Sequence, residues 1–111
     1  MSQDPLQTPF AVSFHTLTHR IVLAPMTRMR ASSSGVPHTR AADYYSARTT
    51  PNATSLLISE GIVIHPRGNG FPNTPGIWGE EQVGAWKPIT RAVREGGGVF
   101  FAQLWSVVLC L

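Results

Sequence analysis

The sequence has a single cysteine, few charged residues and no long uninterrupted apolar segment. Cys110 has no second cysteine to pair with, so the chain is not a disulfide-stabilised secreted domain, and a reducing compartment, the cytoplasm, is expected. The first nine residues contain neither a basic nor an apolar segment, which argues against a signal peptide. The apolar segment 99–111 is interrupted by Gln103 and Ser106 and is shorter than the roughly 20 residues of a membrane-spanning helix.

The composition is that of one small folded domain. Hydrophobic residues make up 42% of the 111 residues and charged residues only 14%, which excludes general disorder. The net charge of +3 comes from basic residues spread along the chain, so no nucleic-acid-binding surface is predicted. His15 and His19 lie four residues apart in a strand or turn with no third ligand nearby, so no metal site is predicted.

Three apolar segments have the length and composition of buried strands. They span residues 20–26, 55–64 and 99–105, and turn residues bound each of them. Before the first, residues 10–14 alternate apolar with small or polar side chains, which predicts a short strand or hairpin within a lead-in segment, 1–19.

Two helices are predicted between these strands, from apolar residues that recur every three or four positions. The first spans about residues 40–48, with Thr39 as its N-cap. The second ends at the three glycines 96–98, and Pro88 interrupts it by either kinking it or occupying the first turn of its second half. Its apolar stripe consists of Val83, Trp86, Ile89 and Val93.

The order strand, helix, strand, helix, strand is typical of right-handed crossovers on a parallel sheet, so the predicted fold class is α/β. The connection 65–79, rich in glycine and proline, follows the carboxyl end of a strand. Because α/β folds bind ligands at that end of the sheet, this connection is predicted to lie at the functional edge.

Five stretches in order along the chain resemble the old yellow enzyme family. They read RIVLAPMTRMR at 20–30, YYSAR at 44–48, SEG at 59–61, NTPGIW at 73–78 and FFAQLW at 100–105. AWKPI at 85–89 and TTP at 49–51 are most similar to the plant oxophytodienoate reductase branch and its fungal relatives. The resemblance covers about residues 10–105 and implies a (β/α)8 TIM barrel, of which the chain holds about three of the eight strands.

The resemblance implies an FMN-dependent NAD(P)H oxidoreductase, an ene reductase. In this family NAD(P)H reduces the flavin, which passes a hydride to the β-carbon of an α,β-unsaturated carbonyl compound. The implied cofactor-binding residues all lie at carboxyl strand ends: Pro25, Met26 and Thr27 along the isoalloxazine, Gly61 close beneath it, and Gln103 at its pyrimidine edge. The Thr27 hydroxyl would bond near flavin O4 and N5, which tunes the potential of the ring.

Three of the residues in these stretches can also be explained without a bound ligand. A threonine after an apolar strand usually serves a turn, and a lone tryptophan such as Trp105 usually packs in a core. Gln103 within an apolar strand is costly unless its amide finds a partner, so a partner is predicted for it in either case.

The resemblance ends at Trp105, which it assigns to the wall of the substrate pocket. The family continues with a histidine, a short apolar step and Gly-Arg, whereas residues 106–111 read SVVLCL, an aberrant apolar tail. The family's carbonyl-binding, proton-donating and FMN-phosphate-binding residues follow that point, so no catalytic residue is assigned. We therefore expect weak or no FMN retention and no ene-reductase turnover by this chain alone.

Two other functional classes remain open at this point. The chain can be a non-catalytic truncated isoform or gene-model fragment that self-associates, or binds a full-length homologue, through an exposed strand edge. A third hypothesis makes 99–111 a membrane-associating tail, which the lack of a basic flank opposes. The expected partners are FMN and, in the intact family, a small enone, with no nucleic acid and no membrane.

Overall fold

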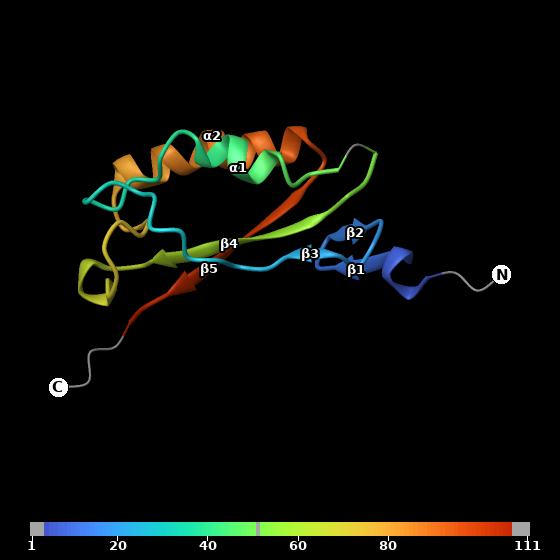
Figure 1. Ribbon diagram of the computed structural model, residues 1–111, viewed down its shortest axis with the longest axis horizontal. Coiled ribbons are helices and arrows are strands. Elements are labelled where there is room, and N and C mark those ends of the chain that lie inside the picture. The colour runs from blue at the N-terminus through green and yellow to red at the C-terminus, as the bar shows by residue number, and fades with distance from the viewer. Residues whose placement is uncertain (1–3, 51, 108–111) are drawn as a thin grey trace.

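The computed structural model describes residues 4–50 and 52–107 (Figure 1). From position 108 on, the predicted apolar tail lies outside the described residues, as do residues 1–3 of the lead-in segment and Cys110. The elements in chain order are η1 (Pro5–Gln7), β1 (Phe10–Val12), β2 (His15–Leu17), β3 (Val22–Leu23), α1 (Ala41–Ser46), β4 (Leu56–Val63), η2 (Pro66–Gly68), α2 (Glu80–Glu95) and β5 (Val99–Trp105).

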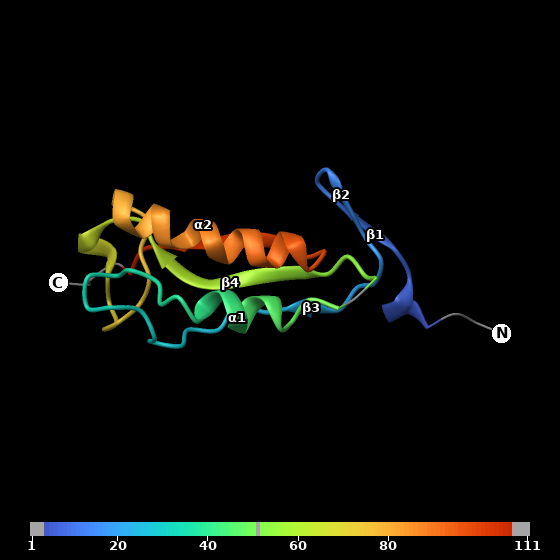
Figure 2. The same ribbon diagram turned by 90° about the horizontal axis from the view of Figure 1, so that it is seen from above.

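The described chain forms two layers, a parallel sheet and two helices that cover one of its faces. The strands lie in the order β3-β4-β5 and both pairs are parallel. Helices α1 and α2 lie side by side over the same face of the sheet (Figures 1 and 2). The predicted α/β class and the order of crossovers are therefore confirmed.

A core fills the space between the helices and the sheet. From α2 it takes Trp86, Ile89 and Val93, from α1 Tyr45, and from β4 Leu57, all at most 5% exposed. The predicted helical stripe is wrong at one position, because Val83 is 41% exposed and Gln82 is buried instead. Residues 82, 86, 89 and 93 also recur at helical spacing, so the buried stripe begins at residue 82 and not at residue 83.

Gln82 is buried because its side chain satisfies backbone groups at the start of α2. Its Oε1 accepts hydrogen bonds from the Trp78 and Gly79 N–H groups at 2.9 and 3.1 Å. Its Nε2 donates to the Ser34 carbonyl at 2.9 Å, which joins the loop after β3 to this helix. The buried amide therefore has partners at both ends, as a polar group in a core requires.

Helix α2 is continuous from Glu80 to Glu95 with Pro88 inside it, so the alternative that Pro88 begins a second half of the helix is wrong. A proline removes the hydrogen bond to the carbonyl four residues earlier, which belongs to Gly84. Both residues are exposed, so that carbonyl is open to water and the helix continues past it.

Helix α1 is shorter than predicted, and Thr39 is not its N-cap. Arg40 occupies the cap position without a side-chain hydrogen bond. His38 takes the role instead, because its Nδ1 accepts the Arg40 N–H at 3.0 Å and its carbonyl accepts the Ala41 N–H at 2.9 Å.

Strand β3 is also shorter than the predicted segment 20–26. Only Val22 and Leu23 pair with β4. Pro25 has no N–H to donate, so the ladder ends there. Ahead of β3, β1 and β2 form an antiparallel hairpin that places buried Leu17 against Leu56 and Val99 at the amino ends of the sheet (Figure 2).

Candidate functional site

The carboxyl ends of β4 and β5 lie at one edge of the sheet. Strand β3 ends opposite Leu57, near the start of β4, and the segment after it reaches this edge through the Arg28–Glu60 ion pair. Strands β4 and β5 pair with Gly61 opposite Gln103 and with Val63 opposite Trp105. The structure therefore brings together three of the predicted site residues. The other three, Pro25, Met26 and Thr27, follow β3 as extended chain, Pro25 half-buried and the other two exposed.

Gly61 lies directly beneath the indole of Trp105. A Cβ added at Gly61 would be 2.6 Å from Trp105 Cδ2 and 2.7 Å from Cε2, well inside contact distance. Phe71, from the predicted functional connection 65–79, stacks on the same indole with ring centroids 5.7 Å apart. In this structure the missing Cβ of Gly61 thus makes room for a tryptophan of the chain itself.

Three hydrogen-bonding groups lie near this edge, two on exposed side chains and one buried. The side chains of Thr27 and Gln103 are exposed, so Gln103 does not need the protein partner that its place in an apolar strand predicted. The Trp105 Nε1 is buried and has no hydrogen-bond partner among the described residues. An exposed hydroxyl and an exposed amide fit the carbonyl and ring-nitrogen edge of a flavin.

A buried polar network that the sequence did not predict lies immediately behind these residues. Arg28 Nε donates to Glu60 Oε2 at 2.8 Å, and the Tyr45 hydroxyl donates to the same oxygen at 3.4 Å. The Glu60 N–H donates to the Tyr45 hydroxyl at 3.0 Å. Glu60 is only 3% exposed, so its charge is held by these partners rather than by water.

The network extends into β5 across an irregularity in the β4–β5 ladder. Between the pairs Ile58–Phe101 and Gly61–Gln103, strand β4 has one residue more than β5, which is a β-bulge. The Ser59 hydroxyl lies in this bulge, donates to the Glu60 carbonyl at 2.7 Å and accepts the Gln103 N–H at 3.0 Å. A serine hydroxyl thus replaces the ladder bond that the bulge removes.

Burial raises the pKa of Tyr45 to about 12, and the nearby Glu60 carboxylate acts in the same direction. The hydrogen bond from the Glu60 N–H and the charge of Arg28 partly oppose this. The phenol is therefore neutral at physiological pH and keeps a proton to donate to Glu60.

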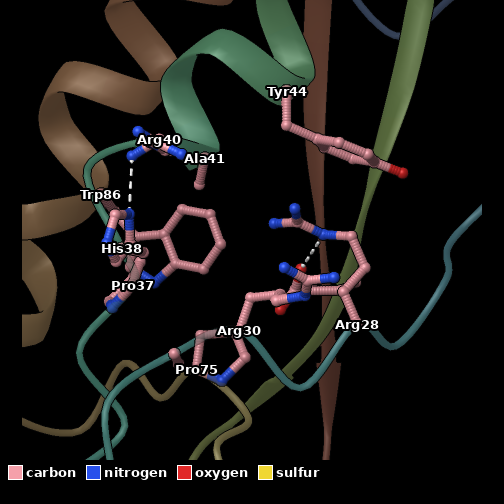
Figure 3. A pocket seen from close by; sticks show the side chains of 11 residues that line it. Arg28, Arg30, Pro37, His38, Arg40, Ala41, Tyr44, Pro75 and Trp86 are labelled. Carbon is pink, nitrogen blue, oxygen red and sulfur yellow. Dashed lines mark hydrogen bonds and ion pairs between the residues drawn. The ribbon is translucent and has the colours of Figure 1, made fainter.

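A cavity of about 590 Å³ lies on the helix-covered side of this network (Figure 3). Arg28 and Arg30 enter it from one side, and His38 and Arg40 from the other. Glu60 lines it as well, but none of the six predicted site residues does. The cavity is therefore separate from the strand-end edge, and the Arg28–Glu60 pair lies between the two.

Comparison with known proteins decides the family. Residues 5–108 match the NADH:flavin oxidoreductase / NADH oxidase family. The chain belongs to this family. It is 52% identical over 105 residues to 12-oxophytodienoate reductase 7 of Oryza sativa subsp. japonica, covering 95% of this chain and 26% of that protein. It is 48% identical over 103 residues to 12-oxophytodienoate reductase 2 of Arabidopsis thaliana, covering 93% and 27%.

A solved structure of the same family agrees in fold. The old yellow enzyme homologue of Zymomonas mobilis superposes with a TM-score of 0.85 at 44% identity, covering 93% of this chain and 28% of that one. The resemblance to old yellow enzymes and the fold, part of a TIM barrel, are thus confirmed. The chain spans about a quarter of the length of the relatives it matches.

Two further features of the described residues bear on the predicted partners. No helix in ranges 4–50 and 52–107 is long and apolar enough to cross a membrane. The same ranges contain no group of three or more histidine, cysteine, aspartate or glutamate side chains placed to hold a metal ion. His19 instead bonds Ser55 through Nε2 at 3.1 Å and accepts the Ile21 N–H at Nδ1.

Proposed function

We propose that this chain supplies the flavin-contacting residues at the ends of β4 and β5 and in the segment after β3 of an NAD(P)H-dependent ene reductase. Family membership supports the use of FMN, and one observation carries the assignment of the site. Gly61 and Gln103 lie opposite each other at the carboxyl ends of adjacent parallel strands, where barrel enzymes hold their ligands. Thr27 precedes Arg28, whose ion pair with Glu60 ties the segment after β3 to the same edge.

In this proposal the predicted residues other than Gly61, which lies under the Trp105 indole, have binding roles. The Thr27 hydroxyl and the Gln103 amide hydrogen-bond the polar edge of the isoalloxazine, while Pro25 and Met26 line its side. FMN, when bound, accepts a hydride from NADH or NADPH and delivers it to the β-carbon of an α,β-unsaturated carbonyl compound. Trp105 forms a wall of the substrate pocket.

Titration of the purified chain with FMN, followed by flavin fluorescence and by co-elution in gel filtration, tests the assignment. Binding is expected to be weak, and Thr27→Val and Gln103→Leu should each weaken it by roughly five- to tenfold, the loss of about one hydrogen bond. Thr16→Val and Gln7→Leu make the same changes at exposed positions of β2 and η1 and should leave the affinity unchanged.

Equal affinities in all five proteins would contradict the assigned residues. Absence of any FMN binding to the unaltered chain would contradict the binding role altogether and favour the non-catalytic alternative, self-association or pairing with a full-length homologue. The observation behind that alternative is the apolar surface of β5, where Phe101 is 38% and Leu104 59% exposed. Analytical ultracentrifugation distinguishes a monomer from an associating chain.

We also propose that the protein works in the reducing environment of the cytoplasm. The single cysteine supports this, because the chain depends on no internal disulfide. Fractionation of cells with an antibody to the chain tests the location, and recovery in an oxidising compartment would contradict it.

A further inference from the structure

The buried network behind the strand ends contacts the chain beside three residues of the proposed flavin site. Arg28 is the neighbour of Thr27 on the segment after β3, and Glu60 is the neighbour of Gly61 in β4. The third residue, Gln103, donates its own N–H to Ser59. Hydrogen bonds to the Glu60 carboxylate, to the Glu60 main-chain carbonyl and to the Ser59 hydroxyl therefore connect the segment after β3 with β4 and β5.

The bulge in β4 decides which face each of these residues occupies. Side chains alternate between the faces of a strand, so a regular ladder after Ile58 would place residue 60, not 61, opposite Gln103. The Glu60 carboxylate would then lie on the same face as Gln103. With the bulge, Glu60 turns to the helix side, where Tyr45 and Arg28 bind it, and Gly61 takes the place opposite Gln103.

Stability alone is a poor explanation for such a network. Burying a carboxylate and a guanidinium costs several kcal/mol each, and apolar side chains of similar size often stabilise a protein as well as the pair does. Within the described residues Arg28–Glu60 is the one ion pair, and it lies beside the predicted site. A buried, hydrogen-bonded ion pair fixes the direction and the distance between two segments more narrowly than an apolar contact does.

We propose that Glu60 is a positioning residue of the flavin site. Its carboxylate holds Arg28 beside Thr27 and, by fixing the bulge, sets the places of Gly61 and of Ser59, which bonds Gln103. This inference rests on the proposed function, which places Thr27 and Gln103 against the flavin and Gly61 opposite Gln103 at the same strand ends. It assigns to the Arg28–Glu60–Ser59 network no contact with the cofactor itself.

Amide hydrogen exchange of the chain without flavin tests the network independently of cofactor binding. Glu60→Gln and Ser59→Ala should speed exchange of the Gln103 amide at least tenfold, while the Val99 amide, at the start of the same strand, changes less than twofold. Glu81→Gln, an exposed glutamate on α2, is the matched control and should change neither amide. Uniform acceleration at both amides would show a merely structural role and overturn the proposal.

FMN titration of the same variants tests the consequence for the site. Glu60→Gln should weaken FMN binding at least fivefold, and Arg28→Met should do the same, whereas Arg28→Lys, which keeps the ion pair, should recover most of the affinity. If the unaltered chain binds FMN and these variants bind it equally well, the positioning role is wrong. If the unaltered chain binds none, the proposed function fails, and the exchange at Gln103 alone decides whether the network fixes the strand ends.

Discussion

Gly61 offers a sharp test of the packing at the strand ends. Its ideal Cβ position lies 2.6 Å from the indole of Trp105, which Phe71 supports from the connection after β4. Gly61→Ala therefore forces the indole or the strand to move. Overpacking of this kind costs about 1–3 kcal/mol of unfolding free energy.

Gly84→Ala makes the same chemical change at a position with the opposite environment. Gly84 lies on α2 with no atom within 4 Å of an added Cβ. Alanine there should stabilise the chain by about 0.5–1 kcal/mol, because glycine has the lower helix propensity. The two substitutions should therefore shift the urea midpoint of unfolding in opposite directions, Gly61→Ala downward by roughly 1–2 M.

The double-mutant cycle with Trp105→Ala identifies the cause. In the Trp105→Ala background the indole is gone, so Gly61→Ala should cost nothing or stabilise slightly, which gives a coupling energy of at least about 1 kcal/mol. Urea unfolding followed by far-UV circular dichroism measures all four proteins. A Gly61→Ala cost that persists without the indole, or a stable Gly61→Ala single variant, would refute the assignment of this contact.

Three further predictions concern the buried polar groups. Gln82→Ala removes a side chain that satisfies three backbone groups and should lower the unfolding free energy by about 1–3 kcal/mol. Gln82→Glu keeps the two accepted hydrogen bonds and should lower it less. The urea midpoints of unfolding compare the two variants. Trp86→Phe removes the indole N–H that donates to the Gly76 carbonyl at 3.1 Å. The unfolding free energy, measured by thermal unfolding, should fall by about 1–3 kcal/mol, and an unchanged value would contradict this hydrogen bond. Because the Tyr45 pKa is about 12 in the folded chain and near 10 when unfolded, the unfolded state binds fewer protons between these values, so stability should fall by roughly 2–3 kcal/mol from pH 10 to 12. Tyr45→Phe should lose that part of the fall, and an identical pH profile would show that Tyr45 does not titrate as inferred.

The sequence predicted the two long strands closely. The predicted segments 55–64 and 99–105 correspond to β4 (Leu56–Val63) and β5 (Val99–Trp105), because continuous apolar runs between turn residues carry a strong strand signal. The length of strand β3 was overestimated, since the number of residues that pair depends on where the partner strand lies. The pattern of α2 gave the correct period but misplaced one buried position, because Gln82 is polar and its backbone partners could not be read from spacing.

The positions of Gly61, Gln103 and Trp105 followed from a family resemblance, but their surroundings did not. No sequence pattern joins Glu60 to Arg28, which is 32 residues away, or Ser59 to Gln103, which is 44 residues away. The only local signal is a polar pair, Ser-Glu, inside an otherwise apolar strand. Such a pair is costly to bury and therefore indicates that partners exist, without indicating which.

The sequence by itself determined the order and kind of the elements, the parallel α/β class and the family of flavin oxidoreductases, since these depend on local composition and on motifs contiguous in the chain. Only the tertiary structure decided that β4 carries a bulge, that Glu60 turns toward Tyr45 and Arg28, and that an indole rather than open space lies over Gly61. Those features arise from contacts between residues distant in sequence, and their energies depend on burial and geometry that exist only after the sheet and helices have packed.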